Sequence, residues 1–198
     1  MTTGLIVCGA LGREISQMVA AYGWDARVIG IPAIDHAFPE RIAPHVEERI
    51  LAWRERCERL IVVFGDCGTR GALDALLKRY PDIERIPGPH CYEMYAGESF
   101  ATLMEEEPGT FFLTDFMVRT FDGLILKSMG LDRYPDLKDE YFRNYRRVVF
   151  LTQSNLPPYR QKARQIAAYL GLPLEIRPTG WGELEKRLVE RIAATEKR

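Results

Sequence analysis

Short apolar runs alternate with longer amphipathic stretches along most of this chain. Together with a few short mixed segments they give the predicted strands, which are Leu5–Val7, Arg27–Ile31, Leu60–Phe64, Asp82–Ile86, Gly109–Thr114, Val148–Thr152 and Leu174–Arg177. The stretches between them carry hydrophobic residues at helical spacing, as Ile15, Met18 and Val19 do after the first strand. This alternation predicts an α/β fold that is Rossmann-like, with a mainly parallel sheet and helices on both faces.

Three segments share one design, in which a buried strand is followed by a turn and a helix. They begin at Leu5, Leu60 and Val148, and they favour repeated strand–turn–helix units. The run Leu60–Phe64 is uninterrupted and β-branched, as expected of a parallel strand covered on both faces. A length of 198 residues predicts a single α/β domain over residues 1–198.

The charges are balanced, with 27 basic and 28 acidic residues and a net charge of -1. A nucleic-acid partner would favour a clustered basic surface, so none is expected. No apolar run approaches the roughly 20 residues of a membrane span, so no membrane association is expected either. The first strand begins without a basic flank and a long apolar region, which predicts a cytoplasmic protein.

Cysteine placement is the most informative chemical feature. Cys8, Cys67 and Cys91 each follow a predicted strand, whereas Cys57 lies in a charged helix and is expected to be structural. Ligands of open α/β sheets bind outside the carboxyl ends of the strands, so parallel pairing would let the three thiols converge. Cytosolic thiols stay reduced, so these cysteines are expected to be metal ligands or nucleophiles and not to form disulfides.

The turns that carry these cysteines are predicted to line a small-molecule or cofactor site. Gly9, Gly65 and Gly68 allow close backbone approach and positive φ, and Thr69 follows in the second turn. Thr114 ends another predicted strand and joins the candidate site, although capping of the next helix by Thr114 or Asp115 is the favoured interpretation there.

Three thiolates suit two kinds of metal site. One is zinc with an open fourth position, or with His90 closing the tetrahedron. The other is an iron–sulfur cluster with one iron not held by cysteine. Helix N-termini nearby are expected to lower the thiol pKa values. Asp66 and His90 are the candidate acid–base groups, while His36 and His45 are expected at the surface.

Two alternatives use the same strand ends without a metal. In a metal-free cysteine enzyme, Cys67 and His90 would form a nucleophile–base pair. A non-catalytic module would bind a corrinoid or another small cofactor, although Asp35-His36 lacks the spacing of the familiar corrinoid loop. Tyr92 and Tyr95 would either shield the site from water or pack in the core.

The order of these motifs resembles that of the bacterial and archaeal domain-of-unknown-function family 1638. The matching pieces are the early strand with Cys8, the Gly65–Gly68 turn, Cys91 after a proline-rich turn, and the strand at Gly109–Thr114. Members of that family are often found near corrinoid-dependent methyltransferase systems. The resemblance therefore implies thiol, methyl-group or corrinoid-linked metabolism, with corrinoid methyltransferase components as partners.

Overall fold

A computed structural model describes residues 2–193 of the chain. They group into two compact units, each built on its own parallel sheet. The first unit comprises residues 2–91 and 185–193, and the second comprises Tyr92–Leu184. Each unit is described by itself below.

The first unit holds a four-stranded parallel sheet in the order β2-β1-β3-β4. Its strands are β1 (Thr3–Cys8), β2 (Ala26–Ile31), β3 (Arg59–Val63) and β4 (Glu84–Arg85). Its helices are α1 (Gly12–Tyr22), α2 (Ile42–Trp53), α3 (Ala72–Leu77) and most of α9 (Gly182–Ala193). Two short 3-10 turns, η1 (Ala33–Ala37) and η2 (Pro39–Arg41), connect β2 to α2.

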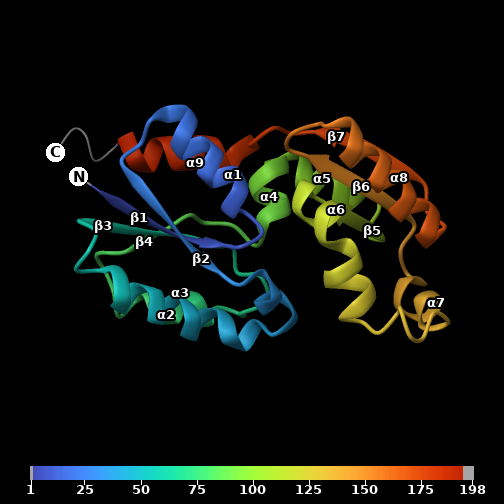
Figure 1. Ribbon diagram of the computed structural model, residues 1–198, viewed down its shortest axis with the longest axis horizontal. Coiled ribbons are helices and arrows are strands. Elements are labelled where there is room, and N and C mark those ends of the chain that lie inside the picture. Colours follow the sequence, from blue (N-terminus) through green and yellow to red (C-terminus); the bar gives the residue numbers. More distant parts are fainter. Residues whose placement is uncertain (1, 194–198) are drawn as a thin grey trace. The chain divides into compact units, whose positions relative to one another are not determined.

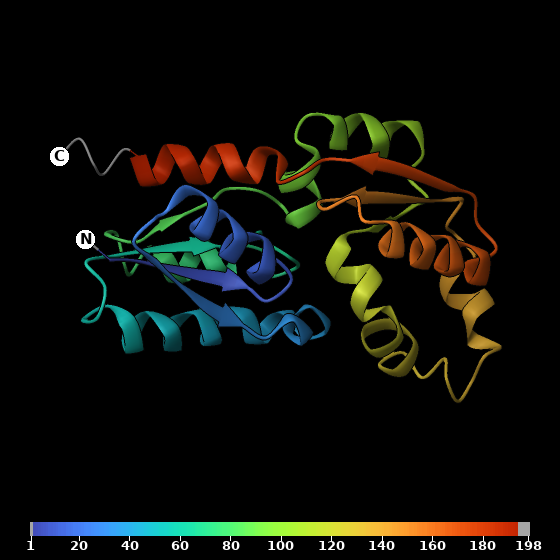
Figure 2. The same ribbon diagram turned by 45° about the horizontal axis from the view of Figure 1, so that its top comes forward.

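Helices cover both faces of this sheet, with α1 and α9 on one side and α2 and α3 on the other (Figures 1 and 2). This arrangement follows from right-handed crossovers, because β1 connects to β2 in one direction and the chain then passes through β3 to β4 in the other. The central strands β1 and β3 are almost entirely buried, which explains their continuous apolar sequences.

The second unit holds a three-stranded parallel sheet in the order β5-β6-β7. Its strands are β5 (Thr110–Leu113), β6 (Arg147–Thr152) and β7 (Leu174–Pro178). Its helices are α5 (Ser99–Glu106), α6 (Asp115–Phe121), the π-helical η3 (Asp122–Lys127), α7 (Leu137–Phe142) and α8 (Pro157–Leu170). The helix α4 (Cys91–Ala96) begins at the boundary between the units.

Two apolar clusters line the faces of the second sheet. One packs α6, α7 and α8 around Phe121 and Phe150, and the other packs α5 against Phe112 and Val149. Figure 2 shows α5 on one side of this sheet and α6 and α8 on the other. The second unit therefore has helices on both faces as well.

The structure confirms the predicted α/β, Rossmann-like fold with mainly parallel pairing and helices on both faces, and every strand pair within residues 2–193 is parallel. The strand–turn–helix segments that begin near Leu5, Leu60 and Val148 are present as β1, β3 and β6 with their following helices. The pairing differs in one respect, since the strands form two sheets where one was expected. The expected strand Asp82–Ile86 is shorter, because only Glu84–Arg85 pairs before the proline-rich turn.

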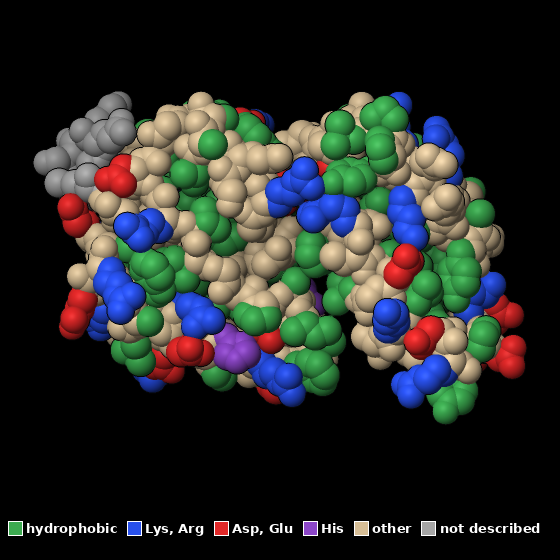
Figure 3. All heavy atoms as spheres, viewed as in Figure 1, with side chains coloured by type: hydrophobic (Ala, Val, Ile, Leu, Met, Phe, Trp, Pro, Cys, Tyr) green, Lys and Arg blue, Asp and Glu red, His purple; other side chains and the backbone are tan. Residues whose placement is uncertain are grey.

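Acidic and basic side chains are interspersed on the face of the molecule drawn in Figure 3. Within residues 2–193, no helix combines the length and apolar character that a bilayer crossing needs.

Candidate functional site

The order in which strands are added to the first sheet reverses between β1 and β3. The chain leaves β1 to form β2 on one side, while β3 pairs with the other side of β1. The loops after β1 and β3 therefore diverge from adjacent strands, which is where open α/β sheets bind their ligands. Cys8 is the last residue of β1, and Cys67 lies in the loop after β3.

Cys8 is held tightly at this edge. Its side chain is 2% exposed, and the backbone N–H of Ala10 donates to its Sγ at 3.4 Å. The neighbouring Gly9 donates its N–H to the Ile31 carbonyl, and a Cβ at Gly9 would lie 2.8 Å from that oxygen. Only glycine lets the loop after β1 approach β2 this closely.

The loop that carries Cys67 runs beside the loop that precedes Cys91. Asp66 and Cys67 donate their backbone N–H groups to the carbonyls of Gly88 and Pro89, at 3.1 and 2.9 Å. A Cβ at Gly65 would lie 2.6 Å from the Cα of His90. Glycine at this position therefore allows the two loops to pack backbone against backbone.

Backbone strain is concentrated in the same loop. Cys67 adopts φ 47 and Arg70 adopts φ 53, both in the left-handed region, and Gly68 between them has φ 86. Non-glycine residues in this region cost of order 1 kcal/mol or more and cluster at functional sites. The strain directs attention to the Cys67 loop as a binding element.

The pKa values of Cys8 and Cys67 are both raised, chiefly by burial. Burial raises the pKa of Cys8 well above its ordinary value, and the negative charges that Cys91 and Cys67 would carry raise it further. Burial raises the pKa of Cys67 to about 11, with the charge of Asp66 adding to the effect. The N–H groups of Gly65 and Cys91 act in the opposite sense by hydrogen bonding to the Cys67 sulfur.

These pKa directions differ from the sequence-based expectation for the thiols. Helix N-termini were expected to favour thiolates, but burial outweighs every hydrogen bond and charge that favours ionisation of Cys8 and Cys67. Without a cation, both side chains are thiols at neutral pH.

Asp66 organises the turn in which Cys67 lies. Its carboxylate accepts the Thr69 hydroxyl at 2.6 Å and the backbone N–H groups of Arg70 and Gly71 at 3.1 and 2.9 Å. These bonds, led by that of Thr69, lower the pKa of Asp66. Thr69 and Gly68 therefore act with Asp66 to shape the loop, and the proposed acid–base role of Asp66 stays a prediction.

His36 is the residue of this edge that sequence reasoning missed. Its Nε2 lies 3.7 Å from the Cys8 Sγ, and its Nδ1 lies 2.9 Å from the Ala33 carbonyl oxygen. The ring is half-buried and stacks on Phe64, with centroids 5.9 Å apart. The surface position expected for His36 is therefore wrong, and a signal was available, since His36 follows β2 at the same edge of the sheet.

The remaining histidines and Cys91 lie at the starts of two helices. His90 directly precedes α4, and His45 lies in the first turn of α2. His90 and Cys91 are half-buried, and Cys91 is the first residue of α4. His45 on α2 is half-buried too, with its Nδ1 2.6 Å from the buried carboxylate of Asp35. The role of His90 as an acid–base group stays a prediction.

Cys57 lies at the other end of the sheet. It is 7% exposed, and its Sγ would lie 3.0 Å from a Cβ placed on Gly4, near the start of β1. This position fits the structural role expected for Cys57.

Thr114 belongs to the second unit, where it caps a helix. Its hydroxyl accepts the Met117 N–H at 3.3 Å at the start of α6. The next residue, Asp115, has a carboxylate that accepts hydrogen bonds from the Thr152 hydroxyl, the Gln153 N–H and both the N–H and hydroxyl of Ser154. Thr114 is therefore engaged in local structure, and its cofactor-binding role stays a prediction.

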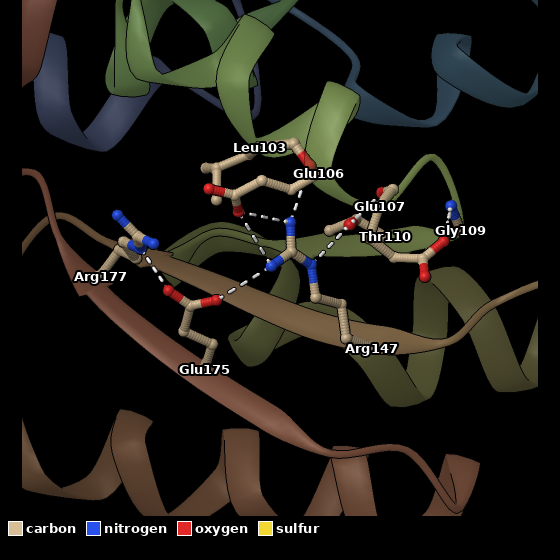
Figure 4. Close-up of polar contacts among 8 residues, drawn as sticks. All are labelled: Leu103, Glu106, Glu107, Gly109, Thr110, Arg147, Glu175 and Arg177. Carbon is tan, nitrogen blue, oxygen red and sulfur yellow. Dashed lines mark hydrogen bonds and ion pairs between the residues drawn. The ribbon is translucent and has the colours of Figure 1, made fainter.

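A second polar network in this unit surrounds Arg147 (Figure 4). Its guanidinium donates to the Leu103 carbonyl at 2.7 Å and the Thr110 hydroxyl at 2.9 Å, and it also pairs with Glu106 and Glu175. Arg147 thereby fastens α5 to the sheet. Tyr92 stacks on Phe112 in the same unit, with centroids 5.4 Å apart, which is the core-packing alternative expected for it.

The donor set at the edge of the first sheet fits a thiophilic metal by its chemistry. Thiolate sulfur and imidazole nitrogen are the ligands that zinc prefers, and cysteines hold iron–sulfur clusters. Backbone N–H groups already point at the Cys8 and Cys67 sulfurs. Among the residues that the structure describes, however, no three His, Cys, Asp or Glu side chains converge as metal ligands.

Comparison with known proteins identifies the family. The model of a family described as a protein of unknown function (DUF1638) matches residues 31–188, which include His36, Cys67 and Cys91 and begin after Cys8. No curated protein and no solved structure matches the chain. The match covers most of the chain and confirms the family that the sequence resembles, so the chain belongs to the DUF1638 family.

Proposed function

We propose that this chain is a metal-site protein in which Cys8, Cys67 and Cys91 hold zinc or an iron–sulfur cluster. The observation that carries the proposal is the position of Cys8 and Cys67 at the switch point of the first sheet, with the loop that precedes Cys91 hydrogen-bonded to the loop of Cys67. An α/β fold binds its ligands at this position.

Hydrogen bonding to the sulfurs supports a metal rather than a bare nucleophile. The Ala10 N–H donates to Cys8, and the Gly65 and Cys91 N–H groups donate to Cys67. Such bonds stabilise negative charge on sulfur and tune clusters. Because burial still keeps the pKa of Cys67 at about 11, a cation is needed to hold the thiolate at neutral pH. This weighs against the metal-free enzyme.

The loops would position the metal ligands and admit a small molecule. Gly9 and Gly65 allow the close backbone approaches, and Asp66 with Thr69 holds the turn that presents Cys67. A bound zinc would stabilise thiolates at neutral pH and so supply a nucleophile for thiol or methyl-group chemistry. His90, next to Cys91, is the proposed proton carrier for a substrate at this edge.

The proposed setting is the cytoplasm, whose reducing conditions keep the thiols available as ligands. The proposed partners are a small-molecule substrate or cofactor and components of corrinoid methyltransferase systems. That last link comes from the family's genomic neighbours alone. A non-catalytic module that binds a small cofactor at the same strand ends is the second candidate, and it shares the switch-point position.

The test is the metal and acid-labile sulfide content of protein purified without oxygen. Wild-type protein should contain about one zinc per chain, or iron with sulfide, and Cys67→Ser should lose it. Cys57→Ser is the matched control, since it replaces another cysteine of the same unit at the other end of the sheet, and it should keep the metal. Metal-free wild-type protein, or equal content in Cys67→Ser, would contradict the proposal.

A further inference from the structure

The loop after β2 brings a fourth ligand-type side chain to the proposed metal site. The turn η1 crosses the carboxyl end of β1, where a Cβ on Gly9 would lie 3.0 Å from the Ala33 backbone nitrogen. His36 lies on this turn, and its Nε2 is 3.7 Å from the Cys8 Sγ. The imidazole therefore reaches the most buried of the three thiols.

The protonation of the His36 ring follows from its other contact. The Ala33 carbonyl oxygen, 2.9 Å from Nδ1, can only accept a hydrogen bond, so Nδ1 carries a proton. In the neutral ring, Nε2 then has the free lone pair, and that lone pair faces Cys8. A carbonyl that fixes the tautomer in this way is the usual partner of a metal-ligating histidine.

The ring is also fixed in position. It stacks on Phe64, which is fully buried directly after β3, at an interplanar angle of 18°. The preceding residue, Asp35, is 2% exposed and is bound to His45 of α2, so the turn is anchored to a helix. His36 is therefore held at the edge shared by β1 and β3 before any ligand arrives.

The distance between sulfur and nitrogen matches a shared tetrahedral zinc. With Zn–S near 2.3 Å and Zn–N near 2.0–2.1 Å, two ligand atoms at the tetrahedral angle lie about 3.6 Å apart. The observed Cys8 Sγ to His36 Nε2 distance is 3.7 Å. The Cys8 and His36 donor atoms therefore lie at the spacing of two ligands of one zinc, and Cys67 and Cys91 would have to turn toward them to supply the other two.

We propose that His36 is the fourth ligand of the site, so that Cys8, Cys67, Cys91 and His36 form a closed set of three sulfurs and one nitrogen. The inference rests on the proposed function, and it replaces His90 as the residue that closes the tetrahedron. A closed set leaves no metal position open in the resting protein.

The test is X-ray absorption at the zinc edge, on protein loaded with Zn²⁺ alone under anaerobic conditions. Wild-type protein should show about three sulfurs near 2.3 Å and one nitrogen near 2.0–2.1 Å, with the outer-shell scattering of an imidazole. His36→Phe keeps the ring that stacks on Phe64 but has no nitrogen. It should lose the imidazole signal and bind zinc about 100-fold more weakly or worse.

Two further variants separate ligation from a structural role. His36→Cys should restore tight binding with a fourth sulfur in place of the imidazole signal. His45→Gln, whose side-chain amide can still donate to Asp35, should keep the wild-type spectrum. Far-ultraviolet circular dichroism of each variant establishes that it is folded.

Two outcomes overturn the inference in distinguishable ways. If wild-type protein binds zinc and His36→Phe keeps both affinity and imidazole scattering, His36 is no ligand while the three-cysteine site stands. If the imidazole scattering is lost in His90→Gln and kept in His36→Phe, His36 is again no ligand, and His90 is the fourth ligand instead. If wild-type protein binds no zinc, the proposed function fails and the inference fails with it.

Discussion

The two sheets of this chain end differently at their carboxyl edges. In the first unit, β1 ends at Cys8 and β3 leads into Cys67, and the sulfurs of both receive weak N–H bonds. Cys67 also lies in a loop with left-handed backbone conformations. In the second unit, β5 and β6 lead into Asp115 and Thr152, where one buried carboxylate receives four hydrogen bonds from the adjacent loop.

The difference shows how one position in a fold serves two purposes. The Asp115 carboxylate is saturated by its own chain, so its network holds the loop after β6 and leaves little capacity for a ligand. The thiols are held in the protonated form by burial and would gain most from a cation. The strand order adds to the contrast. In the first sheet β2 and β3 are added on opposite sides of β1, which creates a switch point, whereas the second sheet follows sequence order from β5 to β7.

The largest expected effect is the loss of stability on removal of the Asp115 carboxylate. Asp115→Ala should lower the free energy of unfolding by about 3 kcal/mol, because it leaves buried donors of Thr152 and Ser154 without their acceptor. Urea denaturation measures the change, and zinc binding should be unaffected. A loss below about 1 kcal/mol would remove the structural role assigned to Asp115.

The next effect depends on pH and concerns the thiol edge. An unfolded Cys67 ionises near its ordinary pKa of 9.0 and the folded one near about 11, so the unfolded chain releases the proton first as pH rises. The stabilisation is complete below pH 9 and is lost as the pH passes through about 11. It amounts to at most about 2.7 kcal/mol.

Urea denaturation of metal-free protein between pH 8 and 11 checks this expectation against Cys67→Ser. The stability of wild-type protein should fall more steeply with pH than that of the variant, because only the wild type carries this thiol. Parallel pH profiles would mean that Cys67 is as well solvated in the folded protein as in the unfolded chain.

Close packing of the two cysteine loops predicts a smaller loss. Gly65→Ala places a Cβ 2.6 Å from the His90 Cα, so one loop must move, at a cost of about 2 kcal/mol and with weaker zinc binding. Gly12→Ala on α1 is the matched control, since no atom lies within 4 Å of its added Cβ. Equal behaviour of the two variants would show that the loops are not held in contact.

The smallest effect concerns Arg147 in the second unit. Arg147→Lys keeps the charge but loses the fork that reaches the Leu103 carbonyl and the Thr110 hydroxyl together, for a cost of about 1 kcal/mol (Figure 4). Thermal unfolding measures it. Replacement of the more exposed Arg143, which pairs with Glu140 alone in a surface contact, should be within error of wild type.

Much of the fold could be predicted because buried strands leave a local signature. The apolar runs at Leu60 and Val148 predicted β3 and β6, and the glycines after Cys8 and Cys67 indicated tight turns that the structure contains. The division into two sheets could not be predicted, because the apolar sequence of a buried strand does not show which strand it pairs with.

The site was harder to predict where its contacts are distant in sequence. Cys8, Cys67 and Cys91 could be grouped because each follows a strand. His36 lies in a proline-rich loop without periodicity, so its place after a predicted strand was the one local signal, and its contact with Cys8 spans 28 residues of sequence. The donors to Asp115 lie 37 to 39 residues further along the chain, so its saturation was invisible as well.

The most direct test of the central claim is calorimetric titration of reduced, metal-free protein with Zn²⁺ near pH 7, in two buffers of different ionisation enthalpy. The account predicts about one zinc per chain and the release of about two or more protons, because Cys8 and Cys67 are thiols before binding. Cys57→Ser should behave like wild type. No zinc binding, or unchanged binding in a Cys8→Ser, Cys67→Ser double variant, would contradict a metal site at this edge.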